Sequence, residues 1–134
     1  MRVISDPASP PPSPPPPEPS DARRLGLVGE DLLVRSRIAP LAGAAGWRLL
    51  AVRSLADAWG CDLLLFDLNR ELEARLELLT EVRAAVPQVP AICFGAHLEA
   101  GSWAEAARRL GAVRCVANSR LADVLRRYLA PGRR

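Results

Sequence analysis

Short apolar runs alternate with segments of helical periodicity from residue 25 onward. The apolar runs carry little polar alternation, which is typical of strands buried on both faces of a parallel sheet. We therefore predict strands at 25–28, 48–52, 62–66, 91–94 and 113–117. Helical spacing predicts helices at 31–45, 54–60, 70–86, 99–110 and 119–129, with Pro40 expected to kink or divide the first. This order predicts an α/β fold: a doubly wound, five-stranded parallel sheet of βα repeats with helices on both faces.

The first residues have a different composition from the rest of the chain. Residues 1–20 hold nine of the 13 prolines, a composition that cannot form a helix or a sheet. We predict a disordered, extended tail at 1–22, a single domain at 23–131 and a short tail at 132–134. The proline-rich tail is either a solvated segment or a ligand for an aromatic groove. We also expect the domain to stand alone, without a DNA-binding output domain after it.

Composition and missing motifs exclude several functions. The net charge of +3 is mild and forms no dense basic stripe, so nucleic acid is an unlikely partner. The sequence has no membrane-length apolar run and no signal-peptide pattern, which predicts a cytoplasmic protein. Neither a Gly-x-Gly-x-x-Gly nor a phosphate-loop motif is present, which argues against a dinucleotide or triphosphate site.

Reactive side chains are few. All 18 basic residues are arginine, so no mechanism that needs a lysine can operate. The single histidine excludes a multi-histidine metal cluster. Cys61, Cys93 and Cys115 have no Cys-x-x-Cys spacing, and we predict that they are buried, reduced thiols.

Polar residues follow the predicted strands at the sheet edge where sites of doubly wound proteins form. Asp67 directly follows the apolar run Leu63–Phe66, so it is either a reactive carboxylate or only the polar residue that ends the strand. The positions at this edge are Gly29, Glu30, Asp31, Asp67, Asn69, Gly95, Ala96, His97, Asn118 and Ser119.

The sequence resembles the receiver domain of two-component response regulators over residues 24–130. The motif DLLLFD at 62–67 is similar to the third strand of that family, Asp-Leu-Val-Leu-Leu-Asp. Glu77, Leu78 and Leu79 fit the Glu-Leu-Leu that follows, and GAVRCVANS at 111–119 lines up with Gly-Ala-x-x-Tyr-Leu-x-Lys-Pro. The resemblance implies a flavodoxin-like fold with receiver-like βα repeats, and it implies that Asp67 is the phosphoacceptor position. It also implies a weak Mg²⁺ site formed by Glu30, Asp31 and Asp67; we expect no other cofactor.

The departures from the family fall in the implied active site. One of the two acidic positions is Gly29, and the hydroxyl position at the end of the fourth strand is Gly95 or Ala96. The aromatic switch position holds Cys115, and the lysine position holds Asn118. The family neutralises the charge of the transferring phosphoryl group with Mg²⁺, a lysine and a hydroxyl. Losing one preorganised stabiliser costs about 10²–10³ in rate, so Asp67 is expected to be inactive as an acceptor.

These features predict a degenerate receiver, a pseudo-receiver of bacterial signal transduction without enzymatic activity. We expect it to bind a protein partner, or a second copy of itself, independently of phosphorylation. Trp103, Ala107 and Leu110 are the candidates for the partner face; packing of Trp103 beneath its own helix is the alternative. Two other functions remain open: a phosphorylatable receiver that uses Asp67 in a phosphorelay, and a flavodoxin-like module that binds a small ligand or nucleic acid.

Overall fold

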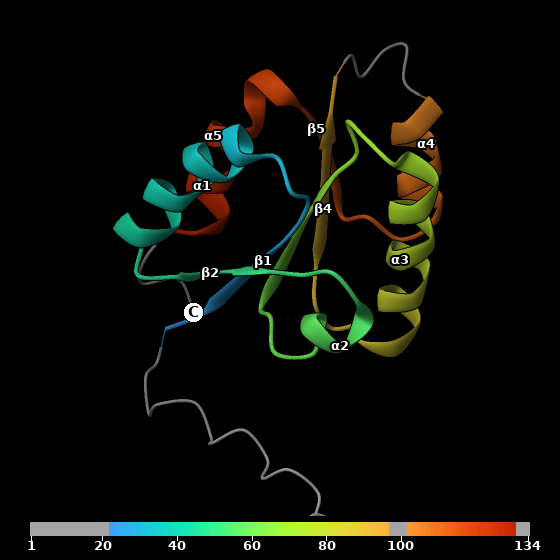
Figure 1. The fold of residues 1–134 in the computed structure, drawn as a ribbon, viewed down its shortest axis with the longest axis horizontal. Helices are drawn as coiled ribbons and strands as arrows, with labels where there is room; N and C mark the ends of the chain where they lie inside the picture. Colours follow the sequence, from blue (N-terminus) through green and yellow to red (C-terminus); the bar gives the residue numbers. More distant parts are fainter. Residues whose placement is uncertain (1–21, 97–101, 131–134) are drawn as a thin grey trace, which may run out of the picture.

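The computed structural model describes residues 22–96 and 102–130, in which strands and helices alternate (Figure 1). The predicted tail lies outside these residues up to residue 21, as do residues 131–134. The strands are β1 (Arg24–Val28), β2 (Arg48–Ala51), β3 (Leu63–Asp67), β4 (Ala91–Gly95) and β5 (Arg114–Ala117). The helices are α1 (Leu32–Ala44), α2 (Leu55–Ala58), α3 (Leu72–Ala85), α4 (Ser102–Arg109) and α5 (Leu121–Tyr128), and a 3₁₀ turn, η1 (Asn118–Arg120), precedes α5.

The strands form one parallel sheet in the order β2-β1-β3-β4-β5. Because all strands run the same way, their carboxyl ends meet at one edge of the sheet. All residues of β3 and β4 are buried, as expected for central strands covered by helices on both faces. The predicted fold class is therefore confirmed.

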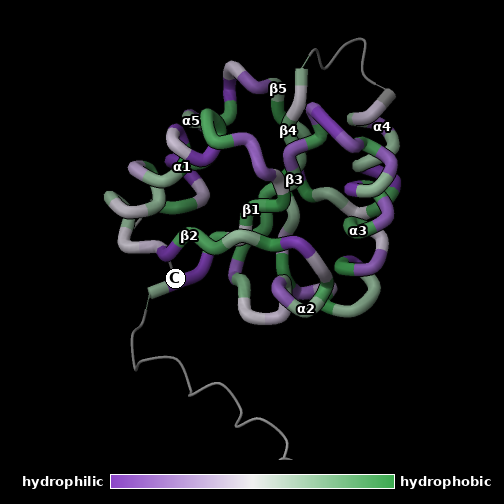
Figure 2. Tube along the Cα trace, viewed as in Figure 1, coloured by the Kyte–Doolittle hydropathy of each residue, from purple (hydrophilic) through white to green (hydrophobic). Residues whose placement is uncertain are grey.

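Helices lie on both sides of the sheet (Figure 1), and an apolar layer packs between the sheet and the helices on each side. On one side, Leu25, Leu27, Leu65 and Phe94 pack with α1 and α5. On the other side, residues such as Phe66 pack with α2, α3 and α4. The strands in the middle of the molecule are coloured hydrophobic in Figure 2, while polar residues lie on the outer parts of the helices. The sheet thus contributes side chains to two cores, one on each of its faces.

The helices differ from the prediction in two details. Helix α1 runs through Pro40 without being divided. Helix α2 has only four residues, fewer than the predicted range of 54–60. No helix in the described ranges has the length and apolar character needed to cross a membrane.

Gly26 in β1 lies where the core leaves no room for a side chain. A Cβ atom there would lie 2.7 Å from Cys61 Sγ and 2.7 Å from a methyl of Val52. We expect Gly26→Ala to lower the free energy of unfolding by about 1–3 kcal/mol through overpacking. Gly43 in α1 is the matched control because nothing lies within 4 Å of its Cβ position.

Gly43→Ala should be neutral or stabilise by up to about 1 kcal/mol, since alanine favours a helix. Urea unfolding of both variants measures the difference. Equal stabilities of the two variants would contradict the packing of β1 against Cys61 and Val52.

Candidate functional site

Asp67 lies at the carboxyl end of β3 and is buried, with 3% of its surface exposed. Its Oδ1 accepts two hydrogen bonds from Asn69: one from the backbone N–H at 2.9 Å and one from Nδ2 at 2.7 Å. Such bonds satisfy the charge of a buried carboxylate. One oxygen of the predicted acceptor is therefore already occupied within its own turn.

Asn69 is held in turn by Asn118, which follows β5. The two side-chain amides exchange hydrogen bonds: Asn69 Nδ2 donates to Asn118 Oδ1 at 3.1 Å, and Asn118 Nδ2 donates to Asn69 Oδ1 at 3.0 Å. We call Asn69 and Asn118 the amide clamp. Asn118 stands at the lysine position implied by the resemblance, and it contributes a neutral amide that is directed at Asn69.

Gly29, at the end of β1, is in contact with the side chain of Asp67. A Cβ at Gly29 would lie 2.8 Å from Asp67 Cβ and 3.3 Å from its Oδ2. Any side chain at this position would force Asp67 to move. Glycine at position 29, where the family has an acidic residue, therefore leaves the space that the Asp67 side chain occupies.

The other two predicted metal ligands are directed to other partners. Glu30 is exposed and lies 3.9 Å from the Nε of Arg53. Asp31 caps α1, and its Oδ1 accepts from the backbone N–H groups of Leu33 and Val34. No three Asp, Glu, His or Cys residues among those the structure describes are grouped to hold a metal ion. The structure thus does not bring Glu30, Asp31 and Asp67 together as one cation site.

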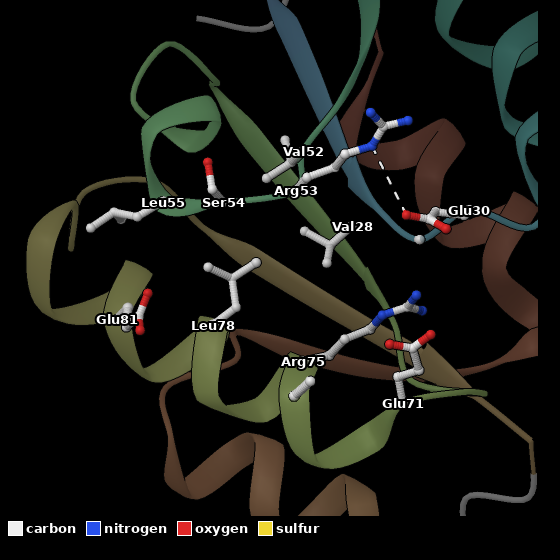
Figure 3. Close-up of a pocket in the computed structure, with 12 residues that line it drawn as sticks. Val28, Glu30, Val52, Arg53, Ser54, Leu55, Glu71, Arg75, Leu78 and Glu81 are labelled. Atoms are coloured by element: carbon white, nitrogen blue, oxygen red, sulfur yellow. Dashed lines mark ion pairs between the residues drawn. The ribbon is translucent and has the colours of Figure 1, made fainter.

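Among the described residues, two of the clefts at this edge of the sheet have volumes of about 330 Å³ and about 350 Å³, and Asp67 lines neither. The first, of about 330 Å³, lies between the end of β2, α2 and α3 (Figure 3). Arg53 and Arg75 reach into it from opposite walls, above an apolar floor that includes Val28 and Leu78 (Figure 3). Arg75 Nη1 also donates to the backbone carbonyl of Asp67 at 2.8 Å, so α3 fixes the acceptor backbone directly.

The second cleft, of about 350 Å³, lies on the α1 side. Its lining includes both residues of the amide clamp, together with Leu33, Arg37 and Arg70. The clamp therefore faces a solvent-accessible cleft and separates it from Asp67.

At the end of β4, an indole ring lies at Gly95, one of the two candidates for the position where the family has a hydroxyl residue. The ring of Trp103, from α4, lies 3.0 Å from the position of a Cβ on Gly95. Trp103 Nε1 donates to the carbonyl of Ala96 at 3.0 Å. The ring fits at this position because Gly95 has no side chain. His97, which follows, lies outside the described residues.

This packing contradicts the predicted partner face. Trp103 is 8% exposed and Ala107 is fully buried, and both belong to the core between the sheet and the α3–α4 layer. Leu110 is half-buried against the same core. The stripe points inward because it covers the sheet, so the alternative, Trp103 packed beneath its own helix, is the one observed.

The predicted switch position is filled by a small thiol. Cys115 in β5 is half-buried, and its Sγ donates to the carbonyl of Ala104 at 3.5 Å. It contacts the same core as Trp103. A thiol this short cannot perform the inward and outward movement of an aromatic ring.

Of the comparisons with known proteins, the one with solved structures identifies the fold. No protein-family model matches the sequence, and no curated protein does. Among solved structures, the TorR receiver domain superposes with a TM-score of 0.66 at 18% identity, covering 79% of this chain and 92% of that one. The chain has the fold of a response-regulator receiver domain.

Two further receiver-like structures match this chain to a similar extent. The CheY-like protein TadZ from Pseudomonas aeruginosa gives a TM-score of 0.66 at 17% identity, covering 81% of this chain and 99% of that one. NtrX from Brucella abortus gives 0.64 at 20% identity. That match covers 81% of this chain but only 27% of NtrX, so this chain corresponds to about a quarter of that protein.

Sequence reasoning missed the amide clamp, the hydrogen bond from Arg75 to the Asp67 carbonyl and the contact of Trp103 with Gly95. Asn69 and Asn118 are 49 residues apart, and no local pattern links them. The signal that could have found the pair is the topology, because both residues follow strands that end at the same sheet edge.

Proposed function

We propose that this receiver-fold chain is a bacterial signalling module that binds a partner protein without being phosphorylated at Asp67. The observation that carries the proposal is the surroundings of Asp67: a buried carboxylate, bonded to Asn69, beneath the amide clamp. A phosphoryl donor must reach a carboxylate oxygen in line, and 3% exposure leaves little access. Similarity to receiver domains supports the signalling role.

The charge environment supports the same conclusion. Phosphoryl transfer is catalysed mainly by positioned positive charge. Here Asn118 is neutral and bonded to Asn69, while Glu30 and Asp31 have partners of their own. A phosphoryl group on Asp67 would therefore lack both a metal site and a lysine to balance its charge.

A surface for the partner is available at the start of α1. Leu32 and Leu33 are 77% and 75% exposed, and Leu33 borders the second cleft. Arg37 and Arg70 line that cleft, and neither forms an ion pair with a residue in the described ranges. Exposed leucines beside unpaired arginines fit a partner segment that carries apolar and acidic side chains.

The test is incubation with acetyl phosphate and Mg²⁺, followed by intact-mass measurement and by capture of the partner from cell extract. We expect no phosphoryl adduct, and equal capture of the same protein by wild type and Asp67→Asn. Leu33→Glu should abolish capture, whereas Trp59→Glu, at another exposed apolar position, should not. A phosphoryl adduct that Asp67→Asn removes would establish the working phospho-receiver instead.

A further inference from the structure

Cys93 and Cys115 are cross-strand neighbours. Cys93 in β4 is paired with Cys115 in β5 in the parallel register. Adjacent strands lie about 4.8 Å apart, and disulfides usually join Cα atoms about 4.4–6.8 Å apart. Residues in register on adjacent parallel strands point to the same face, and both thiols lie in the layer beneath α3 and α4. The backbone spacing therefore permits a bond between them.

Access to the two thiols is unequal. Cys93 is fully buried, whereas Cys115 is half-buried in β5, which is an edge strand of the sheet. Burial raises the pKa of Cys93, and the nearby Cys115 adds to that increase. Burial also raises the pKa of Cys115, but Arg108 opposes this effect. Cys115 is therefore the more accessible of the two to a reagent in solution, and the second thiol lies beside it on the neighbouring strand.

We propose that Cys93 and Cys115 form an oxidisable dithiol, in which a hydroperoxide attacks Cys115 and Cys93 resolves the product. In the first step, the Cys115 sulfur attacks one oxygen of hydrogen peroxide, the O–O bond breaks, and a sulfenic acid and water form. In the second, the Cys93 sulfur attacks the sulfenic sulfur, the S–O bond breaks, and a disulfide and a second water form. The dithiol loses two electrons and two protons, and the peroxide gains them.

The bond would change the layer above it. The reduced Cys115 thiol donates to Ala104 in α4, next to the buried Trp103. A disulfide has no S–H, so this link between β5 and α4 would be lost. The inference is independent of the proposed function, since it does not involve Asp67 or α1.

The experiment uses the wild-type full chain. It is treated with hydrogen peroxide, unfolded in iodoacetamide and cleaved after arginine. Cleavage separates the three cysteines into peptides 54–70, 84–108 and 115–120. We expect peptides 84–108 and 115–120 to be joined by a bond that dithiothreitol breaks, while Cys61 in 54–70 is alkylated. Tryptophan fluorescence, to which Trp103 contributes together with Trp47 and Trp59, should change with oxidation and recover on reduction.

Two variants provide the controls, with folding checked by circular dichroism. Cys115→Ser should leave Cys93 as a thiol after the same treatment, and Cys61→Ala should not change the 84–108 to 115–120 link. The proposal is overturned if Cys93 is recovered alkylated while Cys115 is oxidised to a sulfinic acid or joined to a second chain. It is also overturned if both thiols survive in the folded chain.

Discussion

Replacing Trp103 by alanine is expected to lower the free energy of unfolding by about 3–5 kcal/mol, the usual cost of removing a buried aromatic side chain. Trp103 is 8% exposed, packs against Gly95 and donates to the carbonyl of Ala96. Alanine would leave a cavity beneath α4 and a carbonyl without its donor. A domain of this size has about 5–15 kcal/mol of stability in total, so the loss should be visible as a large decrease in Tm.

Trp59→Ala is the matched control, because it makes the same chemical change at a tryptophan that is 60% exposed. Substitutions at such surface positions usually change stability by about 0.5 kcal/mol or less. Guanidinium unfolding of both variants, followed by circular dichroism, measures the contrast. If Trp103→Ala were no more destabilising than Trp59→Ala, the indole would not be part of the core, and Trp103 would again be a candidate for the partner face.

The fold could be predicted because each strand is marked by its own composition. The runs around Leu64 and Ile92 are apolar on both faces, and the observed strand ends differ from the predicted ones by at most one residue. Pro40 was harder to interpret. A proline removes one helical hydrogen bond, but α1 has enough buried contacts, through Ile38 and Ala42, to continue past it.

The candidate site could be predicted only in part. The strand pattern fixed Asp67 at the end of β3. The pattern could not separate a metal ligand from a helix cap, because Asp31 precedes a helix in either role. Nor could it show that Glu30 lies beside Arg53, which is 23 residues further along the chain.

The predicted partner face was wrong for a related reason. Trp103, Ala107 and Leu110 form one stripe at helical spacing, and a stripe records that one side of a helix is covered. It does not record whether the cover is the helix's own sheet or another protein. Gly95 leaves space for the Trp103 ring, but the sequence alone does not show that these two residues are in contact.

Restoring two charged groups should convert Asp67 into an acceptor. The double variant Gly29→Asp, Asn118→Lys places a second carboxylate beside Asp67 and replaces one half of the amide clamp by a cation. The new acid has to displace Asp67, and two adjacent carboxylates repel each other. We therefore expect the variant to be less stable than wild type in EDTA, and Mg²⁺ to raise its Tm.

With Mg²⁺ bound between the two acids and a lysine at 118, the transferring phosphoryl group would gain two stabilisers of the kind worth about 10²–10³ in rate each. We expect acetyl phosphate to label the double variant at least about 10²-fold faster than wild type, as measured by intact mass, and Asp67→Asn in the same background to remove the label. Asn118→Arg in place of Asn118→Lys is the matched control, since its planar guanidinium carries the same charge but does not replace a lysine point charge. A double variant that binds Mg²⁺, melts cooperatively and still takes no label would show that Gly29 and the amide clamp are not what blocks Asp67. The obstacle would then lie in the burial of the carboxylate by the Asn69 turn or in the missing hydroxyl at Gly95.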